Sequence, residues 1–171
     1  KFYPNVDHEI LKQLLRRKIK DKDLLWLLDG IIDSADGLPI GNYLSQYFAN
    51  FYLTYFDHWI KEVKGAKYYF RYADDMVIFS SNKDDLHKLL AEMRAYLQVN
   101  LKLEIKGNYQ IFPISIRGID FVGYRIYPTH TLLRKSIKKR FIKAKKPRSL
   151  AAYKGWLKHC NARNLERTYF L

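Results

Sequence analysis

The chain is poor in the features that mark secreted and membrane proteins. Its 171 residues include a single cysteine, Cys160, which excludes an internal disulfide and fits a reducing compartment. No run approaches the roughly 18 apolar residues that a membrane helix needs, and no signal peptide is visible. We therefore expect a cytoplasmic protein without a membrane partner.

The five histidines also lack the spacing of metal ligands. The nearest pair is His159 beside Cys160, and a helix surface next to a buried thiol is a simpler interpretation of that pair than a zinc site. Hydrophobic residues nevertheless make up 48% of the chain. This content indicates a globular protein with one domain, or with one domain and part of another.

Acidic residues are nearly absent from the last quarter of the chain. Residues 131–171 contain thirteen Lys and Arg residues and one acid, Glu166, so this segment carries +12 of the total net charge of +14. The preceding 130 residues carry 18 basic and 16 acidic residues. A solvated helix surface is one interpretation, but an excess of this size favours a polyanionic partner, usually nucleic acid.

The hydrophobic pattern predicts both helices and strands. Helices are expected at about 7–19, 24–32, 42–64, 81–100, 133–141 and 149–160, with Asp7 and Ser81 as N-caps of the first and fourth. Strands are expected at 1–6, 67–72, 76–80, 101–105 and 118–126, with 109–114 pairing nearby. Two glycines and a proline favour an unusual backbone in the loop at 33–41.

Two adjacent carboxylates interrupt the stretch YYFRYADDMVIF, residues 68–79, whose apolar flanks look like two buried strands. Asp74 and Asp75 would repel each other and resist burial unless a cation joined them. Mg²⁺ prefers one or two carboxylates together with substrate phosphates, and two such ions can act in phosphoryl transfer. A polar turn without chemistry is the alternative, because Asp is a common turn residue.

The YADD hairpin and four further motifs, in order along the chain, resemble those of the reverse transcriptases. KFYPNVDH at 1–8 is similar to the end of the motif that opens the palm, and GLPIGNYLSQYFANFYL at 37–53 is similar to the loop and helix beneath template and nucleotide. YADD at 72–75 resembles the signature hairpin of the bacterial branch. Residues 101–106 resemble the next strand motif, and FVGY at 121–124 resembles the primer-grip hairpin. The resemblance covers essentially the whole chain.

The resemblance implies an α+β fold. Residues 1–127 would be a palm with a ferredoxin-like βαββαβ core, an antiparallel sheet with helices on one face, and residues 128–171 the basic helical start of a thumb. The first metal-binding Asp of the family would fall before Lys1. We therefore expect a fragment that lacks the fingers and one of three catalytic carboxylates, inactive alone but active within a longer parent.

The resemblance also implies site roles. Asp74 would bridge two Mg²⁺ ions, with Mn²⁺ as an alternative, and Asp75 would be its partner. The implied nucleotide- and template-binding residues are Phe2, Tyr3, Pro39, Ile40, Gly41, Ser45, Gln46, Tyr72 and Lys106. Phe121, Gly123 and Tyr124 would bind the primer, and Arg134, Lys138, Lys139 and Lys143 the nucleic-acid backbone. Simple packing stays an alternative for Tyr3 and for the primer residues, as does an ordinary surface position for Lys106.

One departure suggests the subfamily. Ile40 stands where most reverse transcriptases have Gln, and Gly41 to Gln46 follow a G-x-x-x-S-Q pattern that, with residues 153–161, resembles the enzymes of diversity-generating retroelements. Such enzymes copy an RNA template from a DNA or RNA primer with dNTPs, misincorporate opposite adenine, and work with a small basic accessory protein. The alternatives are a group II intron, retron or antiviral reverse transcriptase, and a non-catalytic RNA-binding module of similar architecture.

Overall fold

The computed structural model describes residues 2–143 and 147–170, and the chain divides into two compact units, Lys1–Ile111 and Phe112–Leu171. Within those described ranges, no helix is both long and apolar enough to cross a membrane. Each unit has its own hydrophobic core. The predicted division into a palm at residues 1–127 and a thumb at residues 128–171 concerns functional regions, not compact units, and stays a prediction.

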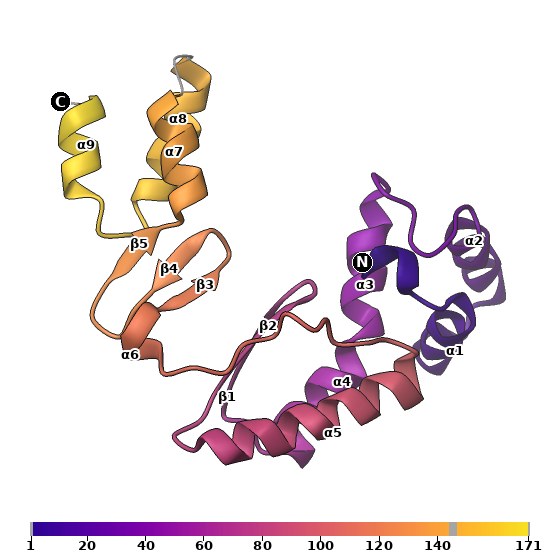
Figure 1. Ribbon diagram of the computed structural model, residues 1–171. Helices are drawn as coiled ribbons and strands as arrows, with labels where there is room; N and C mark the ends of the chain where they lie inside the picture. Colours follow the sequence, from indigo (N-terminus) through magenta and orange to yellow (C-terminus); the bar gives the residue numbers. More distant parts are fainter. Residues whose placement is uncertain (1, 144–146, 171) are drawn as a thin grey trace. The chain divides into compact units, whose positions relative to one another are not determined.

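The first unit is mainly helical and contains one hairpin (Figure 1). Its elements are η1 (Tyr3–Asn5), α1 (His8–Lys18), α2 (Lys22–Ile32), α3 (Tyr43–Tyr52), α4 (Thr54–His58), η2 (Trp59–Val63), β1 (Tyr68–Tyr72), β2 (Asp75–Phe79) and α5 (Lys83–Leu101). Asp7 caps α1 as predicted, because its side chain accepts from the Ile10 backbone N–H at 3.0 Å. The cap of α5 is Asn82 rather than Ser81, since the Asn82 side chain accepts from the Asp84 backbone N–H at 2.9 Å.

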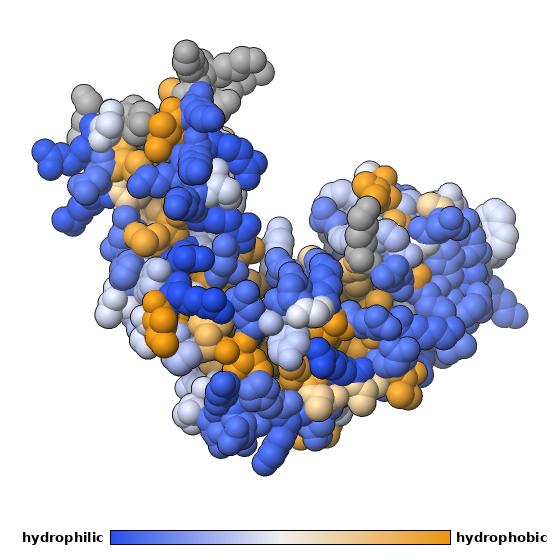
Figure 2. All heavy atoms as spheres, viewed as in Figure 1, coloured by the Kyte–Doolittle hydropathy of each residue, from blue (hydrophilic) through white to orange (hydrophobic). Residues whose placement is uncertain are grey.

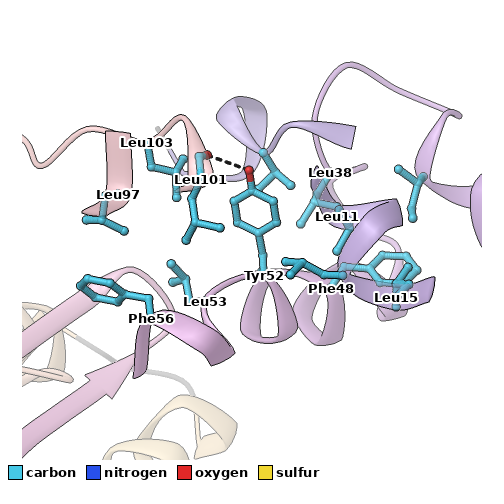
Figure 3. Packing of buried hydrophobic residues seen from close by; sticks show 14 of the residues in the cluster. Leu11, Leu15, Leu38, Phe48, Tyr52, Leu53, Phe56, Leu97, Leu101 and Leu103 are labelled. Carbon is cyan, nitrogen blue, oxygen red and sulfur yellow. Dashed lines mark hydrogen bonds between the residues drawn. The ribbon is translucent and has the colours of Figure 1, made fainter. Parts of the chain in front are cut away.

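The core of this unit gathers around the predicted helix at 42–64, which forms as the consecutive segments α3, α4 and η2 (Figure 3). Tyr52 is fully buried, and its hydroxyl donates to the Leu101 carbonyl at 2.7 Å and accepts from the Asp7 backbone N–H at 3.3 Å. Burial raises the pKa of Tyr52 to about 12. One phenol therefore joins α3 to the start of α1 and the end of α5.

The second unit combines a small sheet with four helices among its described residues. Its elements are α6 (Ile114–Arg117), β3 (Ile119–Phe121), β4 (Tyr124–Ile126), β5 (Thr131–Leu133), α7 (Lys135–Lys143), α8 (Pro147–Leu157) and α9 (Arg163–Phe170). The three strands form an antiparallel sheet in the order β3-β4-β5. Leu133, Ile137, Phe141, Leu157 and Ala162 form its core. The strand predicted at 118–126 is thus a tight hairpin.

Three strand predictions are wrong. Residues 3–5 form a 3₁₀ turn because Pro4 has no N–H for a ladder and suits the start of a helical turn. Lys102, with φ of +50°, ends α5 in a left-handed conformation, and residues 103–105 then pack without a strand partner. Residues 109–113 form no strand either, and α6 begins at Ile114.

The strands around the paired carboxylates are also less buried than predicted. Tyr69 is the one buried residue of β1, and β2 is half-buried after an exposed first residue. Among the described residues, β1 pairs with β2 alone, so this hairpin and the three-stranded sheet are separate. The described residues therefore do not form the βαββαβ order.

Candidate active site

A two-residue turn presents the paired carboxylates. Tyr72 pairs with Asp75 in the antiparallel register, which leaves Ala73 and Asp74 as the turn between β1 and β2. Ala73 has φ of +51°, a left-handed conformation that two-residue hairpin turns favour but that non-glycine residues rarely adopt. Both aspartates are exposed. The tight turn therefore exposes two aspartates that are adjacent in sequence.

Arg71 anchors this turn to the helices beneath it. Its Nη1 donates to the Ala73 carbonyl and to Asn50 Oδ1 of α3, both at 3.0 Å. Its Nε donates to Asp57 Oδ1 of α4 at 2.8 Å, and the Tyr69 hydroxyl donates to the same oxygen at 2.6 Å. Arg71 thus links Ala73, the residue before Asp74, to both α3 and α4.

Arg71, Asp57 and Tyr69 form a partly buried cluster, and burial shifts the pKa values of Arg71 and Tyr69. The Arg71 side chain is 12% exposed and that of Asp57 is 26% exposed. Burial alone would lower the pKa of Arg71, but the hydrogen bond and charge of Asp57 outweigh it, so the pKa is raised. Burial and the hydrogen bond to Asp57 raise the pKa of Tyr69. Arg71 stays charged and Tyr69 stays neutral around neutral pH.

Lys106 lies beside the carboxylate turn, although it is 32 positions away from Asp74 in sequence. Its Nζ is 3.5 Å from Asp74 Oδ2, and both side chains are accessible, at 65% and 40% exposure. The structure thus brings together two groups that the sequence assigned to one site. A cation here can balance one carboxylate and contact an incoming anion.

The N-terminal turn and the glycine-rich loop form a second cluster in the same unit. The Leu38 backbone N–H donates to the Tyr3 carbonyl at 2.9 Å. Gly37 has φ of +67°, and a Cβ there would lie 2.4 Å from the Tyr3 oxygen, so the position requires glycine. His8 Nε2 lies 2.7 Å from the Gly37 carbonyl oxygen. Phe2 and Tyr3 are half-buried against the core.

The loop residues divide into exposed and buried positions. Ile40 is 90% exposed, Gly41 and Gln46 are exposed, and Pro39 is half-buried. Ser45 is buried, and its hydroxyl donates to the Pro39 carbonyl at 2.5 Å. Ser45 therefore positions the loop from within, while Ile40 projects into solvent.

In the second unit, two of the predicted primer residues make internal contacts. The turn between β3 and β4 is formed by Val122 and Gly123, and a Cβ on Gly123 would lie 2.3 Å from the Trp156 ring. The Tyr124 hydroxyl donates to the Trp156 carbonyl at 3.0 Å. Phe121 is half-buried. The hairpin is therefore bound tightly to α8, and its accessible turn residue is Val122.

The basic residues of α7 lie on its solvent side. Ile137 and Phe141 are buried, whereas Lys138, Lys139 and Lys143 are exposed. Arg134 differs from these, because its Nε donates to Asp120 Oδ1 of β3. On the face shown in Figure 2, hydrophilic side chains cover much of the second unit's helices. The three lysines form an accessible cationic surface.

The donor set at the turn suits a hard cation. Among residues 2–143 and 147–170, no group of three or more His, Cys, Asp or Glu residues could enclose a metal ion. Two exposed carboxylates next to open solvent instead match Mg²⁺, which takes one or two carboxylates and completes its shell with water and phosphate oxygens. The residues present therefore fit a cation shared with a substrate.

Some contributing residues escaped the sequence analysis. Arg71, Asp57 and Asn50 received no role, and His8 was noted only as part of a motif. A signal for Arg71 exists, because strand alternation puts it on the same side as buried Tyr69, where a charged residue needs a partner. Which residue supplies that partner is a long-range contact that the sequence does not reveal.

Exposed paired carboxylates next to a lysine suit phosphoryl transfer, in which bound cations and Lys neutralise phosphate charge. This is the chemistry of a nucleotidyltransferase. The family model described as "Reverse transcriptase (RNA-dependent DNA polymerase)" matches residues 1–126, and the chain therefore belongs to the reverse transcriptase family, the RNA-directed DNA polymerases. A search of curated proteins finds no match to the chain. The family implies a nucleic-acid template, a primer and dNTPs as substrates, and generally uses Mg²⁺.

Proposed function

We propose that Asp74 and Asp75 are the metal-binding carboxylates of a primer-extending reverse transcriptase. The observation that carries this proposal is the two-residue turn fixed by Arg71, which exposes both aspartates and has Lys106 beside Asp74. Bound Mg²⁺ would lower the pKa of the primer 3′-hydroxyl and stabilise charge on the transferred phosphate. Lys106 is suited to contact the pyrophosphate leaving group, at a short distance from Asp74.

A third carboxylate would come from outside these 171 residues. The complete βαββαβ palm, with its fingers, is likewise proposed for a longer parent, in which residues 1–127 belong to the palm and 128–171 to the thumb. Tyr3, held next to the loop at 37–41, is proposed as the ring that excludes a ribose 2′-hydroxyl. Lys138, Lys139 and Lys143 would bind backbone phosphates.

The proposal is tested by RNA-templated primer extension with the full-length protein. Asp74→Ala should reduce extension by about three orders of magnitude or more, because loss of a metal carboxylate removes much of the transition-state stabilisation. Asp74 is exposed in a turn, so thermal unfolding should change little. Asp36 is also an exposed loop aspartate, so Asp36→Ala serves as the matched control. Normal extension by Asp74→Ala would exclude the assigned role and favour the RNA-binding module.

The finer proposal is an enzyme of a diversity-generating retroelement with a basic accessory protein. The exposed Ile40 supports it, because an isoleucine at the loop tip offers no hydrogen bond to a nascent base pair. Ile40→Gln should then lower the error frequency opposite template adenine, measured by sequencing the cDNA. An unchanged error spectrum would remove the role of Ile40, and faithful synthesis by the wild type would favour the group II intron or retron alternatives.

A further inference from the structure

His8, the first residue of α1, contacts two acceptors at once. Its Nε2 lies 2.7 Å from the Gly37 carbonyl oxygen, and its Nδ1 lies 3.1 Å from Asp33 Oδ1. Asp33 is the C-cap of α2, and Gly37 follows it by four residues. The imidazole is 23% exposed. One half-buried ring therefore joins the start of α1 to two points of the loop at 33–41.

Neither acceptor can donate a hydrogen bond to the ring. The Gly37 group is a backbone carbonyl, and Asp33 is ionised at neutral pH, because the hydrogen bond and charge of Lys12, reinforced by His8, hold the pKa of its carboxyl below the usual range. A neutral imidazole has a single N–H, so each of its tautomers satisfies one acceptor and loses the other. The doubly protonated ring donates to both, and the geometry fits that form.

The charges around His8 leave Asp33 as its ionic partner. Lys12 Nζ lies 2.8 Å from Asp33 Oδ2 and 3.5 Å from Glu9 Oε1. The carboxylate before His8 in sequence, Asp7, pairs with Lys102 at 2.6 Å, and Asp36 is exposed in the loop itself. Histidine changes its charge between about pH 5 and pH 8. The double contact of His8 should therefore respond to pH.

Gly37 connects this contact to Tyr3. A Cβ at Gly37 would lie 2.4 Å from the Tyr3 carbonyl oxygen, and the next residue, Leu38, donates its N–H to that same oxygen at 2.9 Å. A loop that is released at Gly37 would therefore loosen the backbone contact that holds Tyr3.

We propose that His8 and Asp33 are positioning residues, which clamp the loop at 33–41 against Tyr3 when His8 is protonated. The inference rests on the proposed function, in which Tyr3 excludes a ribose 2′-hydroxyl. As the pH rises and His8 becomes neutral, the clamp loses one of its two contacts. Selection of deoxynucleotides over ribonucleotides should then weaken.

The test is amide hydrogen exchange of the Leu38 N–H in the full-length protein without substrate, at about pH 6 and about pH 8. Protection factors are corrected for the intrinsic pH dependence of amide exchange. In the wild type, protection should fall about fivefold between the two pH values, which corresponds to the contribution of one hydrogen bond.

Two variants should remove this pH dependence in opposite directions. His8→Leu should show the low protection at both pH values, because leucine donates to neither acceptor. Asp33→Asn should show the high protection at both, since the asparagine amide can donate to Nδ1 of a neutral ring whose Nε2–H still contacts Gly37, or flip and accept from a charged ring. A purely structural role would lower protection in both variants. His58→Gln is the matched control, because His58 pairs with Glu62 elsewhere in the unit, and it should keep the wild-type response.

Primer extension tests the connection to Tyr3. The ratio of kcat/KM for a dNTP over the matching rNTP should fall about fivefold in the wild type over the same pH change, stay low in His8→Leu and stay high in Asp33→Asn. The ratio cancels effects of pH that are common to both substrates.

Protection that does not depend on pH in the wild type, or that still falls with pH in Asp33→Asn, would overturn the clamp. Protection that follows the expected pattern without any change in selectivity would overturn its role in positioning Tyr3. If the wild type extends no primer, the proposed function fails, whereas the exchange measurement, made without substrate, still decides whether the clamp exists.

Discussion

Two hairpins, one in each unit, are both closed by a two-residue turn but differ in the second residue of that turn and in what surrounds it. Both are closed by two residues, and in both the first residue is left-handed without being glycine: Ala73 with φ of +51° and Val122 with φ of +42°. The second residue is exposed Asp74 in one hairpin and buried Gly123 in the other. Gly123 also has a positive φ, +87°, whereas Asp74 does not, so two turns of different backbone present a carboxylate to solvent in one unit and allow close packing in the other.

The means of support differ in the same way. The first hairpin is held from the side by polar contacts of Arg71 to Asn50 and Asp57. The second is held through its turn, where Gly123 meets Trp156 and Ile137. A polar anchor leaves the turn tip open to a ligand, whereas an apolar anchor occupies the inner side of the tip. The carboxylates thus lie on the hairpin whose turn tip is open.

The largest effect on stability should come from adding a side chain at Gly123, where there is no room for one. Gly123→Ala puts a Cβ 2.3 Å from Trp156 in a left-handed backbone, so we expect a loss of about 3 kcal/mol in the free energy of unfolding of the second unit. Chemical denaturation measured by Trp fluorescence would detect it. Gly155→Ala is the control, because nothing lies within 4 Å of its Cβ position in α8 and alanine should stabilise the helix by about 0.5 to 1 kcal/mol. Equal responses at the two glycines would refute the packing role of the turn.

A smaller effect should follow from removing the polar anchor of the first hairpin. Arg71→Met leaves Asp57 without its cation, and we expect a loss of about 2 kcal/mol in unfolding free energy. Primer extension should also fall at temperatures where the variant stays folded, because the Ala73 carbonyl loses its contact and Asp74 is no longer fixed. Arg71→Lys should restore little activity, since lysine lacks the planar fork that contacts three partners.

Arg16→Met is the control for that anchor. Arg16 pairs with Asp29 on the surface between α1 and α2, where its side chain is 45% exposed. Exposed ion pairs contribute at most about 1 kcal/mol, so stability should change little and extension not at all. If Arg71→Met behaved like Arg16→Met in both measurements, the hairpin would not depend on its polar anchor.

The sequence predicts local features of this molecule better than distant ones. The predicted helices and the YADD turn follow from apolar spacing within a few residues, and the Asp7 cap follows from its position next to the first helix, whereas α6 and α9 have no counterpart among the predictions. The strand predicted at 101–105 is wrong because alternating leucines can be buried against a core without a strand partner, as Leu101 and Leu103 are. The Arg71 anchor and the contact of Tyr3 with the loop join residues 14 to 35 positions apart, which no local pattern specifies.

The smallest effect concerns the left-handed residue that opens each turn. Val122 is β-branched, and a left-handed backbone costs such a residue at least the roughly 1–2 kcal/mol of an ordinary side chain, whereas asparagine tolerates it well. Val122→Asn should therefore raise the unfolding free energy by about 1 kcal/mol, and Ala73→Asn by about half as much, because alanine is less crowded. The measurement is denaturation of each variant, with Val63→Asn, an exposed valine in η2, as the control that should bring no gain. A gain at Val122 that does not exceed the gain at Ala73 would show that side-chain crowding does not distinguish the two turns. A loss at Val122 would show instead that its exposed side chain packs favourably, and the second hairpin would then depend on both residues of its turn.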